Sequence, residues 1–364
     1  MDLTCTDDQR MLAESVRAFV ARDWPTSTVR SLHEEPDGFS PPLWKRVREL
    51  GWPAIVFPAA WEGLDGSLSD LAVVAEELGR GAVATPLLTS TAVCALPLMW
   101  SGSRPELLAG LVSGERIGTA ALLEPDGRTL WPDAGGGGSW TVTGAKVLVP
   151  FASVADVTLL SCSLDGPGPA LVVLPLDRDG VSVQRHHIAG GEPRFRLGLT
   201  GVRVSTDDVI AHGDEAVALL ERCTDVHTVL QTAYTVGLCE SALGLAVAHA
   251  KDREQFGRPI GSFQAVANRC VDMRVEIDAA RLITLEAAWR LDRDLNATSQ
   301  VATAKAYANL TVRTTITHAH QVLGAMGFST EHDLHLFTRA ARGFEQSHGD
   351  HAAHLERIAV GLGL

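Results

Sequence analysis

The chain has 364 residues, of which 46% are hydrophobic, and a formal net charge of −13. This length allows two or three domains with sizeable cores, and the composition is that of a globular protein. The acidic balance argues against nucleic acid as a partner, because binding to a phosphate backbone needs a basic surface.

Targeting and membrane segments are not predicted. The first twenty residues, MDLTCTDDQRMLAESVRAFV, are acidic and amphipathic, and they lack the basic start and continuous apolar run of a signal peptide. No stretch of 18 apolar residues is present, so no membrane span is expected. The six cysteines lie far apart without a CxxC pair or metal-ligand spacing. This pattern predicts free thiols, no metal site and a reducing, cytoplasmic location.

Residues 1–113 predict an N-terminal helical domain. Thr6 and the two acids after it can cap a first helix that runs to about Val20. The segment LWKRVRELG (43–51) predicts a second helix, and SDLAVVAEELGRG (69–81) predicts a third. Residues 87–112 are expected to continue as helix, with a break near 101–105.

Residues 114–211 predict a middle β domain. From Gly118 the pattern changes to short β-rich runs with glycine turns, including SWTVTGAKVLVP, PALVVLPLD and FRLGLTGVRVSTDDVI. Gly135–Gly138 are expected to form the tip of a hairpin.

Residues 212–364 predict a C-terminal four-helix bundle, from helical runs at 215–251, 266–292, 297–324 and from about Leu334. The predicted fold class is therefore α+β multidomain, with an N-terminal helical domain, a middle β domain and a C-terminal bundle.

The segment REQFGRPIGSFQA (253–265) separates the first two bundle helices. Its two glycines and its proline are costly inside a helix and indicate a turn. Arg253, Gln255 and Phe256 combine a guanidinium fork, an amide and an aromatic ring, which suit a phosphate or a nucleotide. The alternative is an ordinary loop between helices.

This motif, RExFGxPIxxFQ followed by Arg269, resembles the C-terminal domain of the acyl-CoA dehydrogenases. The segment QVLGAMGF (321–328) resembles the Gln-x-x-Gly-Gly-x-Gly-(Phe/Tyr) turn of the same family, with Ala325 in place of the second glycine. The resemblance implies this family's fold, FAD as the cofactor, an acyl-CoA as the substrate and an electron-transfer acceptor.

The resemblance also implies a shared cofactor site. In the family, the residues that match Arg253, Gln255, Phe256, Gln321 and Gly324 reach across an interface to the FAD of a neighbouring subunit. The alternative for the second segment is a glycine turn that only joins two helices.

The middle domain departs from the family pattern. The family's Thr-Glu-Pro is Leu123-Glu124-Pro125 here, and its Lys-x-(Trp/Phe)-Ile-Thr-Asn segment is KVLVPF (146–151). The family's threonines bond the flavin ring, whereas Leu123 and Val149 have no side-chain donor and Pro150 has no N–H. The chain thus keeps the residues it would give to a neighbour's FAD and lacks the usual side-chain contacts to its own.

The catalytic base of the family is a glutamate, found at one of two sequence positions that meet in space. Counting back from Arg253 places His227 at the helix position, and the late turn aligns at His348. Either histidine is a candidate base, because imidazole titrates near neutrality. The other hypothesis is that both are spectators in a subunit without a base.

Carboxylates near these positions are further candidates, namely Asp225, Glu345 and Asp350. The series His348, His351 and His354 lacks the carboxylate or cysteine partners of a metal site.

We therefore expect an FAD-dependent acyl-CoA dehydrogenase subunit in a hetero-oligomer with a second family member. The segment EHDLHL (331–336) resembles the small subunits of actinobacterial heterotetrameric members that degrade steroids and lipids. One alternative is a non-catalytic partner that completes the FAD site of a sister subunit. Another is a tailoring enzyme for an acyl chain on a carrier protein.

Overall fold

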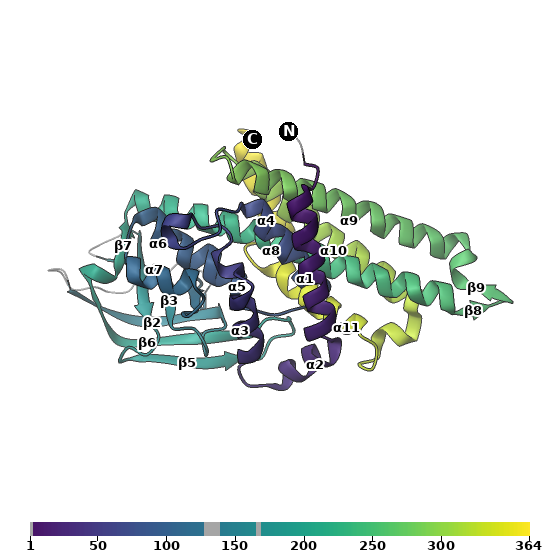
Figure 1. The fold of residues 1–364 in the computed structure, drawn as a ribbon, viewed down its shortest axis with the longest axis horizontal. Helices are drawn as coiled ribbons and strands as arrows, with labels where there is room; N and C mark the ends of the chain where they lie inside the picture. The colour runs from purple at the N-terminus through teal and green to yellow at the C-terminus, as the bar shows by residue number, and fades with distance from the viewer. Residues whose placement is uncertain (1–2, 127–138, 165–168) are drawn as a thin grey trace.

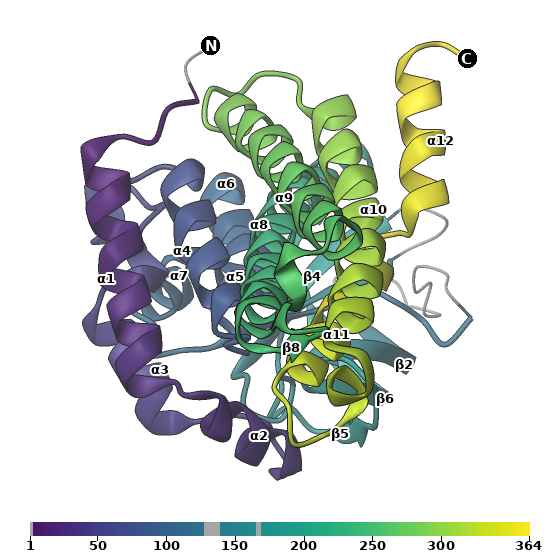
Figure 2. The same cartoon turned by 90° about the vertical axis from the view of Figure 1, so that its right-hand side faces the viewer.

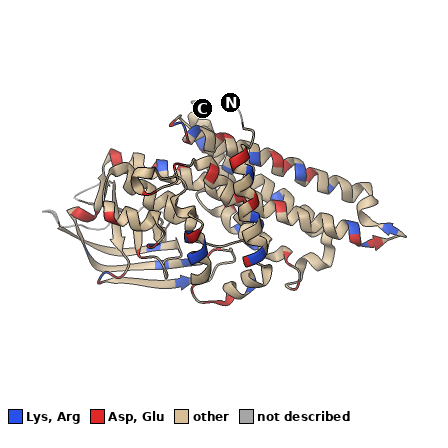
Figure 3. Ribbon diagram, in the orientation of Figure 1, with Lys and Arg blue, Asp and Glu red and all other residues tan. Residues whose placement is uncertain are grey.

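The computed structural model describes residues 3–126, 139–164 and 169–364. The glycine run 135–138, predicted as a hairpin tip, lies outside these residues. Strands and N-terminal helices occupy one end of the molecule, and long helices of the C-terminal part extend to the other (Figure 1). Acidic and basic residues are interspersed over all three parts of the chain (Figure 3).

The N-terminal part consists of helices, as predicted. They are α1 (Asp7–Asp23), α2 (Thr26–Glu34), α3 (Pro41–Glu49), α4 (Leu68–Arg80), α5 (Leu87–Thr89), α6 (Leu96–Ser101) and α7 (Pro105–Val112). A capping box between Thr6 and Gln9 starts α1. Helix α2 was not predicted. A π-helical turn, Ser90–Ala95, joins α5 to α6 and interrupts the continuous helix that was expected there.

The middle part contains two sheets with a core between them. One sheet has the order β1 (Gly118–Ala121), β3 (Val157–Ser163), β4 (Pro169–Pro175) and β7 (Val209–His212). The other has the order β2 (Ser139–Pro150), β6 (Arg194–Ser205) and β5 (Val181–His186). All residues of β3 are buried, because one face packs on the sheet core and the other on the N-terminal helices. This explains its continuous apolar run. The predicted boundary at 211/212 falls inside β7.

The C-terminal part is a bundle around one long helix. It contains α8 (Asp214–Asp252), α9 (Gln264–Leu291), α10 (Thr298–Leu323), α11 (Leu334–Gln346) and α12 (His351–Gly361). The last predicted helix is thus split into two, and Figure 2 shows α12 beside α10. The predicted turn at 253–265 contains a small ribbon of β8 (Glu254–Gln255) and β9 (Arg258–Pro259).

Helix α8 connects the bundle to the N-terminal helices. A Cβ atom at Gly237 would lie 1.9 Å from the carbonyl oxygen of Glu76, and one at Gly79 would lie 2.0 Å from that of Tyr234. Two glycines therefore let the backbones of α4 and α8 approach closely. This contact holds α8 against α4 two to three turns along the helix from His227.

Candidate functional site

The two positions aligned with the family's base meet in the structure. The Nδ1 atom of His227 on α8 lies 2.8 Å from the Nε2 atom of His348, in the turn between α11 and α12. The two rings are edge to face, with centroids 4.8 Å apart and planes at 83°. In a neutral pair, one of these nitrogens donates and the other accepts.

The remaining contacts hold both rings in place. The Nε2 atom of His227 lies 3.2 Å from Oγ1 of Thr89, which comes from the helix preceding the π turn. His354 lies 2.9 Å, through its Nε2 atom, from the backbone carbonyl of His348. His348 has a φ of 57°, a left-handed conformation that is costly for a residue with a Cβ atom. The turn therefore positions His348 against His227 despite this local strain.

Both histidines are held in their neutral forms. Burial, then the proximity of His348 and Arg194, lowers the pKa of His227 well below its usual value. Burial, together with Lys305, Arg194 and His354, lowers the pKa of His348 to about 3. A general base works best when its pKa is near the working pH. A ring with so low a pKa binds protons weakly, and this pair is a poor proton acceptor at neutral pH.

The alternative carboxylates are each engaged elsewhere. Asp225 accepts a hydrogen bond of 2.8 Å from Arg357, and Asp350 caps α12 through the backbone N–H of Ala353. Glu345 is 2% exposed and binds Arg313 and Arg342, at 2.6 Å each. Among the described residues, none of the three carboxylates makes a hydrogen bond to His227 or His348.

Several polar residues beside the histidines were not anticipated. Lys305 is buried on α10 and donates to Asn309, at 2.9 Å, and to the carbonyl of Phe344. Arg194 is paired with Glu192 at 2.8 Å, and burial raises the pKa of Glu192. These residues come from three different elements, so no local sequence pattern links them to His227. Only the match to the family's base positions pointed to this region.

The residues predicted to contact a neighbour's FAD are exposed. Arg253, Gln255 and Phe256 lie at the β8–β9 ribbon, and the Phe256 side chain is 93% exposed with a φ of 55°. Arg253 has no side-chain hydrogen bond or ion pair within the described residues. The ribbon therefore presents a guanidinium without a side-chain partner and an exposed aromatic ring, which lies edge to face with Phe263 at a centroid distance of 6.0 Å.

The second predicted segment lies in the same region of the molecule. Gln321 and Gly324 are exposed at the end of α10, and Gly324 has a φ of 59° with open space where a Cβ atom would be. The pKa of His249, near the end of α8, is lowered first by burial and then by the nearby charges of Arg253 and His332. The loop after Gly324 thus reaches the end of α8 that carries Arg253.

The flavin-side positions of the middle part lack side-chain donors. Val149 is fully buried in the core between the sheets and is inaccessible to a cofactor. Leu123 and Leu148 are about half exposed and purely apolar, and Leu123 pairs through its backbone with Val147. The residues on the ribbon side fit a shared FAD, whereas these side chains offer no polar contact to a flavin ring.

No group of three or more potential metal ligands occurs among the described residues. No helix in this part of the chain is both long and apolar enough to cross a membrane.

Comparison with known proteins identifies the family. Residues 6–115 match the N-terminal domain of the acyl-CoA dehydrogenases, and residues 219–363 match their C-terminal domain. The acyl-CoA dehydrogenase FadE27 of Mycobacterium tuberculosis is 33% identical, over 98% of this chain and 98% of its own length. The probable acyl-CoA dehydrogenase YngJ of Bacillus subtilis is 28% identical, over 99% of this chain and 98% of its own length.

Solved structures agree with this assignment. A chain of the ChsE4–ChsE5 complex from Mycobacterium tuberculosis superposes with a TM-score of 0.92 and 29% identity, covering 100% of this chain and 99% of that one. The predicted fold class is confirmed. The chain belongs to the acyl-CoA dehydrogenase family, whose members are typically FAD-dependent oxidoreductases that act on CH–CH bonds.

Proposed function

We propose that this chain is a subunit of a hetero-oligomeric acyl-CoA dehydrogenase in which it completes the FAD site of a sister subunit. In this proposal its own acyl-CoA slot has no working base. The observation that carries the proposal is the His227–His348 pair. Both positions aligned with the family's base are occupied by rings that bind each other and remain neutral.

The exposed ribbon supports the shared cofactor. Arg253 can donate a charge-assisted hydrogen bond to a phosphate, and Phe256 offers a ring for stacking. Gly324 leaves room for the close approach of a ligand to the backbone. When bound, FAD would supply the acceptor for the hydride that leaves Cβ of the acyl-CoA. The role of this chain is then to hold and orient the cofactor, while the sister subunit supplies the base.

The ChsE4–ChsE5 neighbour is a complex of two differently named chains, which is consistent with a hetero-oligomer. An electron acceptor outside this chain completes the reaction cycle.

A second candidate function is catalysis by His348 itself. The convergence of both base positions and the left-handed backbone of His348 favour it, because strained residues occur often at functional sites. The low pKa of His348 argues against it. A base that removes a proton from Cα would have to hold that proton at neutral pH.

The test is turnover by the complete complex. Variants His348→Ala and His227→Ala are compared with His318→Ala, a histidine on α10 away from the pair, and flavin content is measured in each. We expect all three to retain turnover within a few-fold. A fall of about a hundredfold or more in either pair variant, with flavin still bound, would show that this subunit supplies the base.

A further inference from the structure

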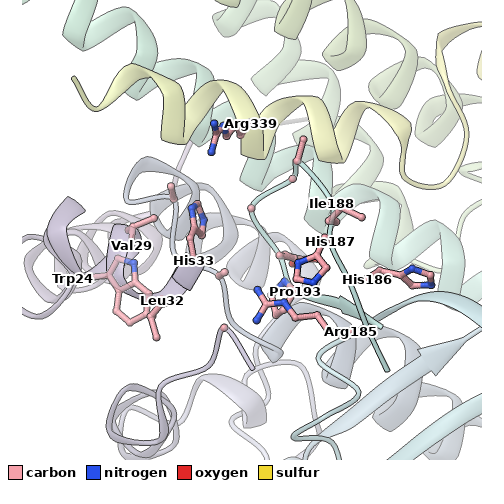
Figure 4. A pocket seen from close by; sticks show the side chains of 17 residues that line it. Trp24, Val29, Leu32, His33, Arg185, His186, His187, Ile188, Pro193 and Arg339 are labelled. Atoms are coloured by element: carbon pink, nitrogen blue, oxygen red, sulfur yellow. The ribbon is translucent and has the colours of Figure 1, made fainter. Parts of the chain in front are cut away.

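A cavity of about 170 Å³ lies between the N-terminal helices, the loop that follows β5 and helix α11 (Figure 4). Its lining includes Glu192, the partner of Arg194 beside the His227–His348 pair, but neither histidine of that pair and no residue of the β8–β9 ribbon. Trp24, Val29 and Leu32 form an apolar wall, whereas the opposite walls carry basic side chains. The cavity has room for several water molecules or for one small solute.

The basic side chains come from three segments. His33 belongs to α2, Arg339 to α11, and Arg185 and His187 to the end of β5 and the loop after it. Figure 4 shows His33 and His187 on different sides of the pocket, with Arg339 on the helix above them. Four potential cationic groups thus surround one small volume in a chain whose net charge is −13.

The two arginines are not paired with a carboxylate among the described residues. Arg339 has no hydrogen bond or ion pair among the described residues. Arg185 donates from Nη1 to the carbonyl oxygens of Glu35 and Pro36 and contacts no carboxylate in this part of the chain. The acidic residue lining the cavity, Glu192, is paired with Arg194 at 2.8 Å. The pKa of His33 is lowered mainly by burial, and the charges of Arg339, His335 and Arg185 lower it further.

Neutral donors in the cavity wall are also unused. Trp24 is 3% exposed, and its buried indole N–H has no hydrogen-bond partner within the described residues. The backbone amides of residues 188–192, which line the cavity, donate no hydrogen bond in this part of the chain. The indole N–H is buried, and a buried donor without a partner is costly, so a ligand that accepts a hydrogen bond from it would be stabilised.

We propose that this cavity binds a small oxyanion, a phosphate or a carboxylate, between Arg185 and Arg339, with any apolar part of the ligand against Trp24. Two guanidinium groups with spare donors suit the oxygen atoms of either group. The anion has two possible sources, a free metabolite or a phosphate of the acyl-CoA thioester. The inference is independent of whether this chain carries out or only supports dehydrogenation.

The test is isothermal titration of the full chain with inorganic phosphate and, separately, with coenzyme A, in a buffer of low chloride concentration. The variant is Arg339→Gln, because Arg339 is exposed and makes no internal bond whose loss would unfold the chain. The matched control is Arg203→Gln, an exposed arginine on β6 away from the cavity. We expect Arg339→Gln to weaken phosphate binding about tenfold or more and the control to leave it unchanged.

The coenzyme A arm distinguishes the sources. If Arg339→Gln weakens coenzyme A binding as well, the anion is a phosphate of the thioester; if it weakens only phosphate binding, the anion is a free metabolite. Either result supports the site. The proposal is overturned if wild-type protein binds neither probe, or if Arg339→Gln and Arg203→Gln bind both as tightly as wild type.

Discussion

The neutral His227–His348 pair predicts a specific loss of folding stability in mild acid. An unfolded histidine titrates near pH 6.5, whereas the pKa of His348 in the folded protein is about 3. Between these values the unfolded chain binds a proton that the folded chain does not. Stability therefore falls as the pH falls below about 6.5, and it is fully retained above that value.

The size of the effect follows from these two pKa values. Each such group changes the free energy of unfolding by about 1.4 kcal/mol per pH unit inside the window. For His348 this integrates to a loss of about 2 kcal/mol between pH 7.5 and pH 5. His227 acts in the same direction, because its pKa is also lowered.

The assay is urea denaturation of the full chain at several pH values between 7.5 and 5, where most carboxylates stay ionised. The variant His348→Asn removes one titrating group and places a residue that tolerates the left-handed conformation. We expect the wild-type stability to fall more steeply with pH than that of His348→Asn, by about 2 kcal/mol over this range. Parallel curves would refute the view that His348 is held neutral in the fold.

Three further predictions concern the cofactor, the assembly and the middle domain. Arg253→Ala should lower flavin retention in the assembled oligomer without unfolding the chain, because a charge-assisted hydrogen bond contributes about 1.5–3 kcal/mol; full flavin occupancy in the mutant would contradict this. Light scattering should show an oligomer that is built through the C-terminal bundle and has a second family member as the partner. The reason is an exposed apolar stripe on α9, formed by Val271, Val275 and Leu282. A stable monomer with stoichiometric flavin would show that the site is not shared. Lys146 is fully buried with its Nζ atom 3.1 Å from Oγ of Ser161, and burial lowers its pKa to about 7. Lys146→Met should therefore cost under about 1.5 kcal/mol, whereas Lys146→Ala should cost at least about 2 kcal/mol through the cavity it leaves; equal losses in chemical denaturation would argue that the amine itself matters.

The long elements could be predicted from the sequence because their patterns are local. The bundle helices are long and periodic, and the glycines and proline after Arg253 end α8 at the expected place. Helix α2 was missed because its nine residues, TSTVRSLHE, bury only Val29 and give a weak apolar pattern. The π turn at Ser90–Ala95 leaves no mark in composition, since all of its residues are compatible with an α-helix.

The site was predictable only as far as the motifs extend. The match to the family located His227 and His348, and the structure brings them together across 121 positions of sequence. The contacts that decide their chemistry come from elsewhere, namely Thr89, Arg194 and Lys305. Such contacts depend on how three regions of the chain pack, and spacing in the sequence carries no information about them.

The exposed tip of the ribbon would make assembly of such a complex depend on the supply of FAD. If FAD is held by Arg253 and Phe256 of this chain and by a sister subunit, the cofactor acts as a ligand of the assembled form alone. By mass action, free FAD at a hundred times its dissociation constant then favours association by about 2.7 kcal/mol, roughly a hundredfold in the subunit equilibrium. Bound FAD would strengthen the association of the subunits, and association would strengthen FAD binding by the same factor. A cell short of flavin would therefore hold a larger share of separated subunits, with the aromatic ring of Phe256 open to solvent.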